Sequence, residues 1–146
     1  MANGEWRDLY IIFFKIYNIY KMMYLFYPAV LITLLFFVSG IEKIYTFSKT
    51  SMGFSKKINI PLSLSNLVIS CVILLEIIAP LIITGYTFTG LFNLLPLFKL
   101  AVISLILFTV AATMMYHNPF NGGKNYYDFI NHLSIIGGLL ALYLCA

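Results

Sequence analysis

Four apolar runs, each long enough to cross a lipid bilayer, constrain this chain more than any other feature. They cover residues 25–47, 64–86, 96–116 and 129–146, and shorter breaks containing polar residues, Gly or Pro separate them. A spanning helix needs about 20 mainly apolar residues, and each run comes close to that length. We therefore expect an all-α, polytopic membrane four-helix bundle whose two termini lie on the same side of the membrane.

The composition excludes an ordinary soluble domain. Of the 146 residues, 62% are hydrophobic and only 10% are charged, whereas soluble domains carry about 25% charged residues. A small soluble fold leaves too much surface in water to hide so many apolar side chains. The net charge of +4 does not indicate nucleic acid, because the few basic residues form no stripe along one face. The lipid bilayer is the expected partner, while the nearly even distribution of Lys and Arg leaves the orientation and the identity of the membrane open.

The first 24 residues differ from the rest and form a separate segment, residues 1–24, ahead of a transmembrane domain at residues 25–146. Plotted at 100° per residue, the polar positions fall within one arc of about 140°. These positions are Arg7, Asp8, Lys15, Asn18 and Lys21. The pattern predicts an amphipathic N-terminal helix lying in the membrane interface. The alternative is that this segment simply begins a long, tilted first span.

The breaks between the apolar runs are expected to connect the spans. Residues 48–60 contain several Lys and Ser residues and predict a polar, basic connection, and residues 117–124 have the Asn, Gly and Pro content of a loop. In the last run, the Gly137-Gly138 pair would allow close contact with another helix. Cys71 and Cys145 show no CxxC or metal-ligand spacing, so we expect inert thiols and no metal site.

Glu76 is the most unusual residue of the apolar runs, because it lies near the middle of the second one. A carboxylate in hydrocarbon is costly, so it indicates either a functional group or a structural hydrogen bond between helices. Both readings stay open. In either case, we expect Glu76 to face the interior of the bundle. Its candidate partners are Ser39 and Thr113 and, if the helices tilt favourably, Lys43 or His117.

Other polar residues gather at the membrane face beneath which Glu76 lies. The full candidate cluster comprises Gly40, Glu42, Lys43, Glu76, His117, Asn131 and His132. At 1.5 Å per residue, Glu76 lies about 16 Å in from that face, whereas Lys43 is near the end of its span. Direct contact between them requires tilt, or a second span that enters the membrane late, near Leu67. No catalytic or metal role is assigned to the cluster.

These residues resemble a short pattern of the DoxX-like family of four-helix membrane proteins. The pattern has Gly and then Lys three residues later at the end of the first span, Glu inside the second, His closing the third, and Asn or His opening the fourth. The matching stretches are SGIEK (39–43), ILLEIIAPL (73–81), MMYHNPF (114–120) and INHLSIIGGLLAL (130–142). The resemblance covers the chain from about Pro28 onward and implies the same fold.

The resemblance implies a membrane subunit more firmly than an activity. Some members of the family are associated with quinone-dependent thiosulfate oxidation or with oxidant defence, and eukaryotic relatives look like chaperones or cargo receptors. We therefore expect an accessory or redox-associated subunit, with quinone as a ligand by resemblance only. The chain lacks paired cysteines for thiol redox work, so it is not expected to be an enzyme by itself. The alternatives are a membrane chaperone or scaffold and a small proton-coupled transporter using Glu76, and the partners would be other membrane proteins or further copies of the chain.

Overall fold

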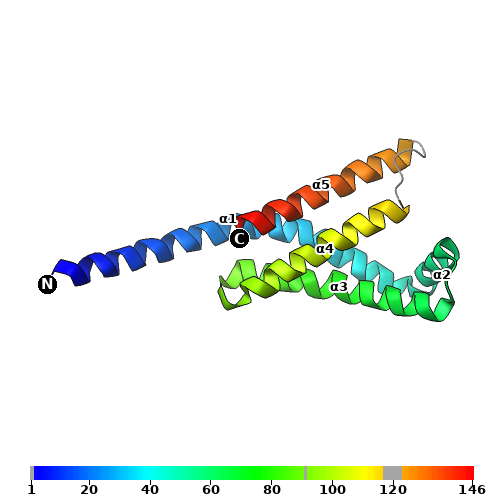
Figure 1. The fold of residues 1–146 in the computed structure, drawn as a ribbon, viewed down its shortest axis with the longest axis horizontal. Coiled ribbons are helices and arrows are strands. Elements are labelled where there is room, and N and C mark those ends of the chain that lie inside the picture. The colour runs from blue at the N-terminus through cyan, green and yellow to red at the C-terminus, as the bar shows by residue number, and fades with distance from the viewer. Residues whose placement is uncertain (1, 91, 117–122) are drawn as a thin grey trace.

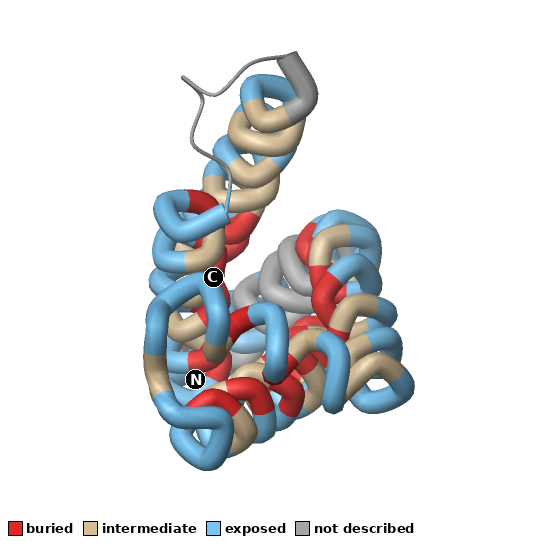
Figure 2. The backbone as a smooth tube through the Cα atoms, turned by 90° about the vertical axis from the view of Figure 1, so that its right-hand side faces the viewer, coloured by how far each residue is buried: buried red, intermediate tan, exposed pale blue. Residues whose placement is uncertain are grey.

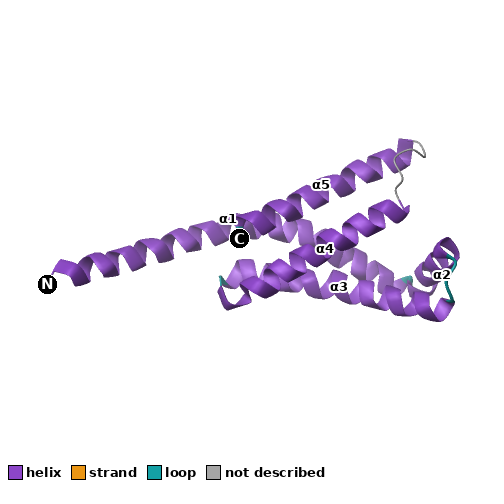
Figure 3. Ribbon diagram, in the orientation of Figure 1, coloured by secondary structure: helices purple, strands orange, loops and turns teal. Residues whose placement is uncertain are grey.

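Every secondary-structure element is a helix in the part of the chain that the computed structural model describes, residues 2–90, 92–116 and 123–146 (Figure 3). In chain order the elements are α1 (Ala2–Tyr45), α2 (Phe47–Ile58), α3 (Leu62–Thr89), η1 (Phe92–Leu94), α4 (Leu95–Tyr116) and α5 (Gly123–Cys145). The expectation of an all-α chain is confirmed.

Four stretches of these helices are long and apolar enough to cross a membrane. They are Tyr24–Tyr45 of α1, Leu62–Thr89 of α3, Leu95–Tyr116 of α4 and Asn125–Cys145 of α5. They correspond to the four apolar runs of the sequence, with boundaries shifted by a few residues. The architecture is therefore that of a multi-pass membrane protein.

The four spans run alternately in opposite directions, as short connections between helices require. In Figure 1, α2 lies at one end of the bundle, whereas the C-terminus and the protruding N-terminal half of α1 lie towards the other. Helix α3 packs against both α1 and α4, and α5 packs against α4 and α1. Buried residues face the space between the helices, while most of the outer surface is exposed (Figure 2).

Helix α1 is continuous from Ala2 to Tyr45, so the expected boundary at Tyr24 has no counterpart as a break between helices. A separate N-terminal interfacial helix is not confirmed. Pro28, near the start of the apolar run 25–47, lies well inside α1. A proline there removes one backbone hydrogen bond, a loss that neighbouring helices in a membrane protein tolerate. Beyond the bundle, the first half of α1 extends along the long axis of the molecule (Figure 1).

Residues 48–60 form a polar, basic connection between two spans, as expected, but most of this connection is folded as the helix α2, which was not expected. This helix is amphipathic: Ser51 and Phe54 are buried, whereas its lysines are exposed. It ends at Asn59, which adopts the left-handed conformation with φ of 57°, a backbone geometry that Asn tolerates well among non-glycine residues. Although this segment is rich in lysine, the spacing of its apolar residues is helical.

Polar side chains attach α2 to the first turns of α3. The Ser65 hydroxyl donates to the Ser51 carbonyl oxygen at 2.6 Å, and the Ser51 hydroxyl donates to the side-chain oxygen of Asn66. Ser51 and Ser65 are both fully buried. Phe54 adds apolar contact in a small cluster with Ile69 and Ile73. The first part of α3 is thus covered by α2 rather than by α1.

The main apolar core lies towards the other end of the bundle. Its fully buried members include Ile83 and Tyr86 of α3, Phe98 and Leu105 of α4, and Leu139 of α5. Of the Gly137-Gly138 pair, only Gly138 makes the expected close contact with another helix. A Cβ atom at Gly138 would lie 2.7 Å from Ile32 Cδ1 of α1, whereas one at Gly137 would meet nothing within 4 Å.

Candidate functional site: a buried ion pair beside a cavity

Glu76 of α3 and Lys43 of α1 form a buried ion pair. The Lys43 ammonium donates to Glu76 Oε2 at 2.7 Å and to Oε1 at 2.8 Å. The Glu76 side chain is only 2% exposed, whereas that of Lys43 is 23% exposed. Because both carboxylate oxygens accept from one ammonium, the geometry is that of an ionised pair. The interior position expected for Glu76 is confirmed.

Ser39, one helical turn before Lys43, completes the network. Its hydroxyl accepts a hydrogen bond from the Lys43 ammonium at 2.6 Å and donates to Glu76 Oε1 at 3.3 Å. The three hydrogens of the ammonium therefore all have acceptors. A buried charge is tolerated only when it is paired and hydrogen-bonded in this way. Ser39 was among the partners expected from the sequence, and that prediction is confirmed.

Gly40 allows α3 to approach α1 at the level of the pair. A Cβ atom at this position would lie 3.1 Å from both Glu76 Cβ and Ile77 Cγ1. These contacts are tighter than ordinary van der Waals packing, so any larger residue would push the two helices apart. Gly40 is thus a packing residue that brings the backbone of α3 close enough for the short side chain of Glu76 to reach Lys43.

The register of the pair differs from what the sequence suggested. We expected contact only with tilt or if the second span began near Leu67, but α3 begins at Leu62, and Glu76 lies about 21 Å further along it. Lys43 lies only about 3 Å before the end of α1 at Tyr45. The two residues meet because α2, not α1, covers the first turns of α3. Glu76 therefore lies level with the last turn of α1, although it is near the middle of α3.

A second polar contact joins α4 and α5 at the same end of the bundle. The Thr113 hydroxyl donates to the Thr109 carbonyl oxygen at 2.6 Å, and its oxygen lies 2.7 Å from His132 Nδ1. Because the single hydroxyl hydrogen of Thr113 is directed to Thr109, His132 Nδ1 is the donor in the second bond. Thr113 was expected to be a partner of Glu76, but it contacts His132 instead.

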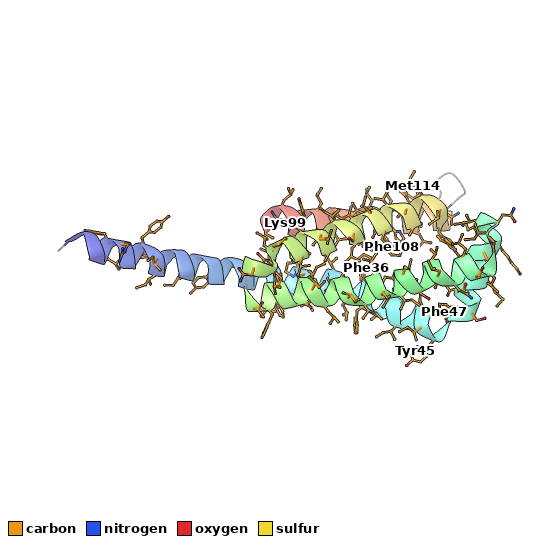
Figure 4. The ribbon with its side chains drawn as sticks, turned by 60° about the horizontal axis from the view of Figure 1, so that its bottom comes forward. Phe36, Tyr45, Phe47, Lys99, Phe108 and Met114 are labelled. Atoms are coloured by element: carbon orange, nitrogen blue, oxygen red, sulfur yellow. The ribbon has the colours of Figure 1, made fainter. Side chains whose placement is uncertain are left out.

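A cavity of about 850 Å³ lies between these two polar contacts. Its walls are largely apolar, and Phe36 of α1 and Phe108 of α4, which are labelled in Figure 4, form part of them. Its polar groups include Lys43, Glu76 and His132. Small-molecule sites are usually concave, apolar clefts of about 300–1,000 Å³ with a few polar groups. The cavity has the size and the chemistry of such a site.

The rim of the cavity at the α2 end is polar. Thr46 and Thr50 face the cavity and lie 3.2 Å apart between their hydroxyl oxygens, and Lys49 is beside them. Across the opening, the Lys57 ammonium of α2 lies 4.2 Å from the centre of the Tyr116 ring of α4. This cation–π contact joins α2 to the end of α4. The cavity is therefore bordered by hydroxyl groups and lysines at the end where a headgroup layer is expected.

The structure brings together five of the seven residues of the predicted cluster. Glu42, Lys43, Glu76 and His132 line the cavity, and Gly40 packs directly behind Glu76. Asn131 is exposed and does not line it. His117 lies outside the described residues.

Several lining residues could not be identified from the sequence. Thr109 is one of three hydroxyl residues in an apolar run, Thr46 lies at the end of the first apolar run, and Thr50 lies in the polar connection 48–60. Their signal would have been the helical spacing of Thr46, Thr50 and Phe54, which places one face of this segment against the bundle.

The described residues include no group of three or more His, Cys, Asp or Glu side chains that could hold a metal ion. Cys71 and Cys145 are free and exposed. Comparison of the chain with protein-family models, curated proteins and solved structures finds no match. Membership of the DoxX-like family therefore stays a prediction.

Proposed function

We propose that this chain is a DoxX-like membrane subunit that holds an amphipathic, quinone-like molecule in the cavity between its spans. It acts as an accessory, redox-associated subunit, with no catalysis of its own. The observation that carries the proposal is the cavity, which combines apolar walls with polar groups at one end. A quinone combines an apolar ring and tail with two carbonyl oxygens, so its two kinds of surface correspond to those of the cavity.

The polar groups of the cavity suit a ring that accepts or donates hydrogen bonds. The Lys49 ammonium and the hydroxyl groups of Thr46 and Thr50 line its rim, where they can contact a bound ring. A quinone carbonyl accepts hydrogen bonds, and the hydroxyl groups of its reduced form can donate to the Glu76 carboxylate. The lysines and hydroxyls of the rim lie where a ligand would enter from the headgroup layer, and the apolar wall accommodates a tail.

The two alternatives find less support. A proton-coupled transporter would require Glu76 to bind and release protons, but both of its oxygens are engaged by Lys43. No particular contact favours a chaperone or scaffold role. Binding of a small amphipathic molecule is therefore the function that the geometry supports best.

Binding of a defined quinone to the purified chain in detergent tests the proposal. The probe is a benzoquinone with a ten-carbon tail, and decanol is the control for the tail alone. We expect native mass spectrometry to detect a one-to-one complex with the quinone, and thermal unfolding to shift upward with its concentration. Equal responses to decanol and to the quinone would overturn the proposal.

A matched pair of variants locates the ligand. Ala112 is half-buried on α4 and lines the cavity, whereas Ala141 of α5 is exposed and does not. Ala112→Phe should fill part of the cavity and weaken quinone binding at least about tenfold, which corresponds to 1.4 kcal/mol. Ala141→Phe adds the same ring elsewhere and should leave binding unchanged. Equal effects of the two substitutions would place the ligand outside the cavity.

A further inference from the structure

A continuous stripe of large apolar residues runs along α1. Its positions follow alternating spacings of four and three residues, which is the a/d pattern of a coiled coil. The members are Trp6, Tyr10, Phe13, Tyr17, Tyr20, Tyr24, Tyr27, Leu31, Leu34 and Val38. Every member is aromatic or aliphatic, and the pattern persists for more than four heptads, which is the length that indicates a coiled coil rather than a chance alignment.

The bundle does not cover this stripe. Within the first span, Tyr24, Tyr27 and Leu31 have 79%, 69% and 69% of their surface exposed. The residues of α1 that pack against the other helices lie on the opposite face, where Ala29 and Thr33 are buried. The stripe and the bundle-facing surface are therefore separate faces of one helix, and a partner could cover the stripe without displacing any span.

The stripe continues into a part of α1 that extends beyond the bundle. The residues before Tyr24 add about 33 Å of helix at 1.5 Å per residue. This half protrudes along the long axis of the molecule (Figure 1). Trp6, Phe13 and Tyr20 are each at least 60% exposed on it. Since the span from Tyr24 to Tyr45 already crosses the hydrocarbon layer, a helix that continues without a break carries these rings out of the lipid, where they need another cover.

We propose that the stripe is covered by a second copy of this chain, so that two α1 helices form a parallel coiled coil through the membrane and beyond it. Two copies inserted with the same topology necessarily place their α1 helices parallel, so each stripe position faces its own copy across a two-fold axis. A pattern of period 3.5 is self-complementary in that arrangement. In the heptad register of the sequence, Asp8, Lys15 and Asn18 occupy positions other than a and d.

The proposal is independent of the cavity and of its ligand. The cavity is lined by the bundle-facing side of α1, including Phe36 and Ser39, whereas the dimer uses the opposite face. Failure of quinone binding would leave the dimer unaffected, and a monomeric protein would leave the proposed ligand site intact.

Disulfide cross-linking in native-like membranes tests the contact. Single cysteines are introduced at Phe13, Tyr20 or Tyr27 of the stripe in the full chain, in a background carrying Cys71→Ala and Cys145→Ala. The control is Ile12→Cys, which is also exposed but lies about 130° from the centre of the stripe. We expect each stripe cysteine to give at least about five times the dimer yield of the control under mild oxidation, because equivalent a or d residues face each other.

Two results would overturn the proposal. Equal cross-linking at Ile12 and at the stripe positions would show random collision rather than a defined interface. Absence of cross-links, together with quenching of labels at Phe13 and Tyr20 by lipid-phase reagents, would show that this half of α1 lies in the membrane interface instead.

The mass of the purified particle gives a second, independent measurement. In mild detergent, we expect a dimer for the unmodified chain and for Ile12→Lys. Tyr20→Lys should yield a monomer, because it places two like charges opposite each other in the coiled coil. Dimers that persist in Tyr20→Lys, or a monomeric unmodified chain, would contradict the assignment and indicate a different interface or a different protein as the partner.

Discussion

Removing the charges of Lys43 and Glu76 one at a time and together should produce strongly non-additive changes in stability. The variants are Lys43→Met, Glu76→Met and the double substitution, since Met is unbranched and comparable in size to both residues. The measured quantity is the free energy of unfolding in mixed micelles, obtained from an SDS titration followed by circular dichroism. Glu42→Met and Lys49→Met remove exposed charges at the same end of the bundle and should change that free energy by less than about 0.5 kcal/mol.

The size of each effect follows from burial. Lys43→Met leaves the Glu76 carboxylate 98% buried with Ser39 as its remaining donor, and breaking a buried pair in this way costs about 3–5 kcal/mol. Glu76→Met should cost less, about 1–3 kcal/mol, because the Lys43 ammonium is 23% exposed and its flexible stem lets it reach the headgroup layer. In the double variant neither charge remains, so it should lie within about 1 kcal/mol of the unmodified chain.

The double-mutant cycle therefore predicts a coupling free energy of at least about 3 kcal/mol. A double variant as unstable as the sum of the single variants would refute the reasoning, since it would mean that the two side chains act independently. Retention of quinone binding by a stable double variant would further show that the pair serves packing rather than the ligand.

Two further predictions concern single positions in the same unfolding assay. Gly40→Ala should lower the free energy of unfolding by about 1–3 kcal/mol, because its Cβ would lie 3.1 Å from Glu76 Cβ. The control is Gly85→Ala, which should be neutral or stabilising by up to about 1 kcal/mol, because a Cβ atom there would meet nothing within 4 Å. Equal losses of stability in the two variants would contradict the close approach at Gly40. Tyr86→Phe should leave stability unchanged or raise it by about 1 kcal/mol, since the buried Tyr86 hydroxyl has no hydrogen-bond partner among the described residues; a clear loss would reveal a partner for that hydroxyl.

The four spans could be predicted from the sequence because the length of each apolar run determines them. Apolar length alone identifies a helix that crosses lipid, and all four runs correspond to spans in the structure. The interior position of Glu76 was predictable for the same reason, because a carboxyl group facing hydrocarbon is too costly. Ser39 was predictable as a partner because it lies on the neighbouring span.

Other features depend on packing that a one-dimensional pattern does not contain. The cavity is formed by side chains from five helices. The periodicity of a single helix does not show how much space remains between several helices. The contact between Thr113 and His132 likewise depends on how α4 faces α5. The polar arc of the N-terminal segment is a pattern in the sequence, and it could not show whether that segment lies along the membrane or continues into the first span.

The pairing of Lys43 with Glu76 shows how one misjudged segment changes the interpretation of a site. If residues 48–60 were a connection without a helix of its own, the second span would begin at the membrane face where the first span ends. Glu76 would then lie too far from that face to reach Lys43. With that segment folded as α2, the first turns of α3 extend beyond α1 and are covered by α2 through Ser51 and Phe54. Helix α3, at about 42 Å for Leu62–Thr89, exceeds the roughly 30 Å of hydrocarbon by about 12 Å. With this excess at the α2 end, Glu76, which is about 21 Å from Leu62, would lie about 9 Å inside the hydrocarbon rather than at its centre, and a ligand entering beside α2 would meet it there.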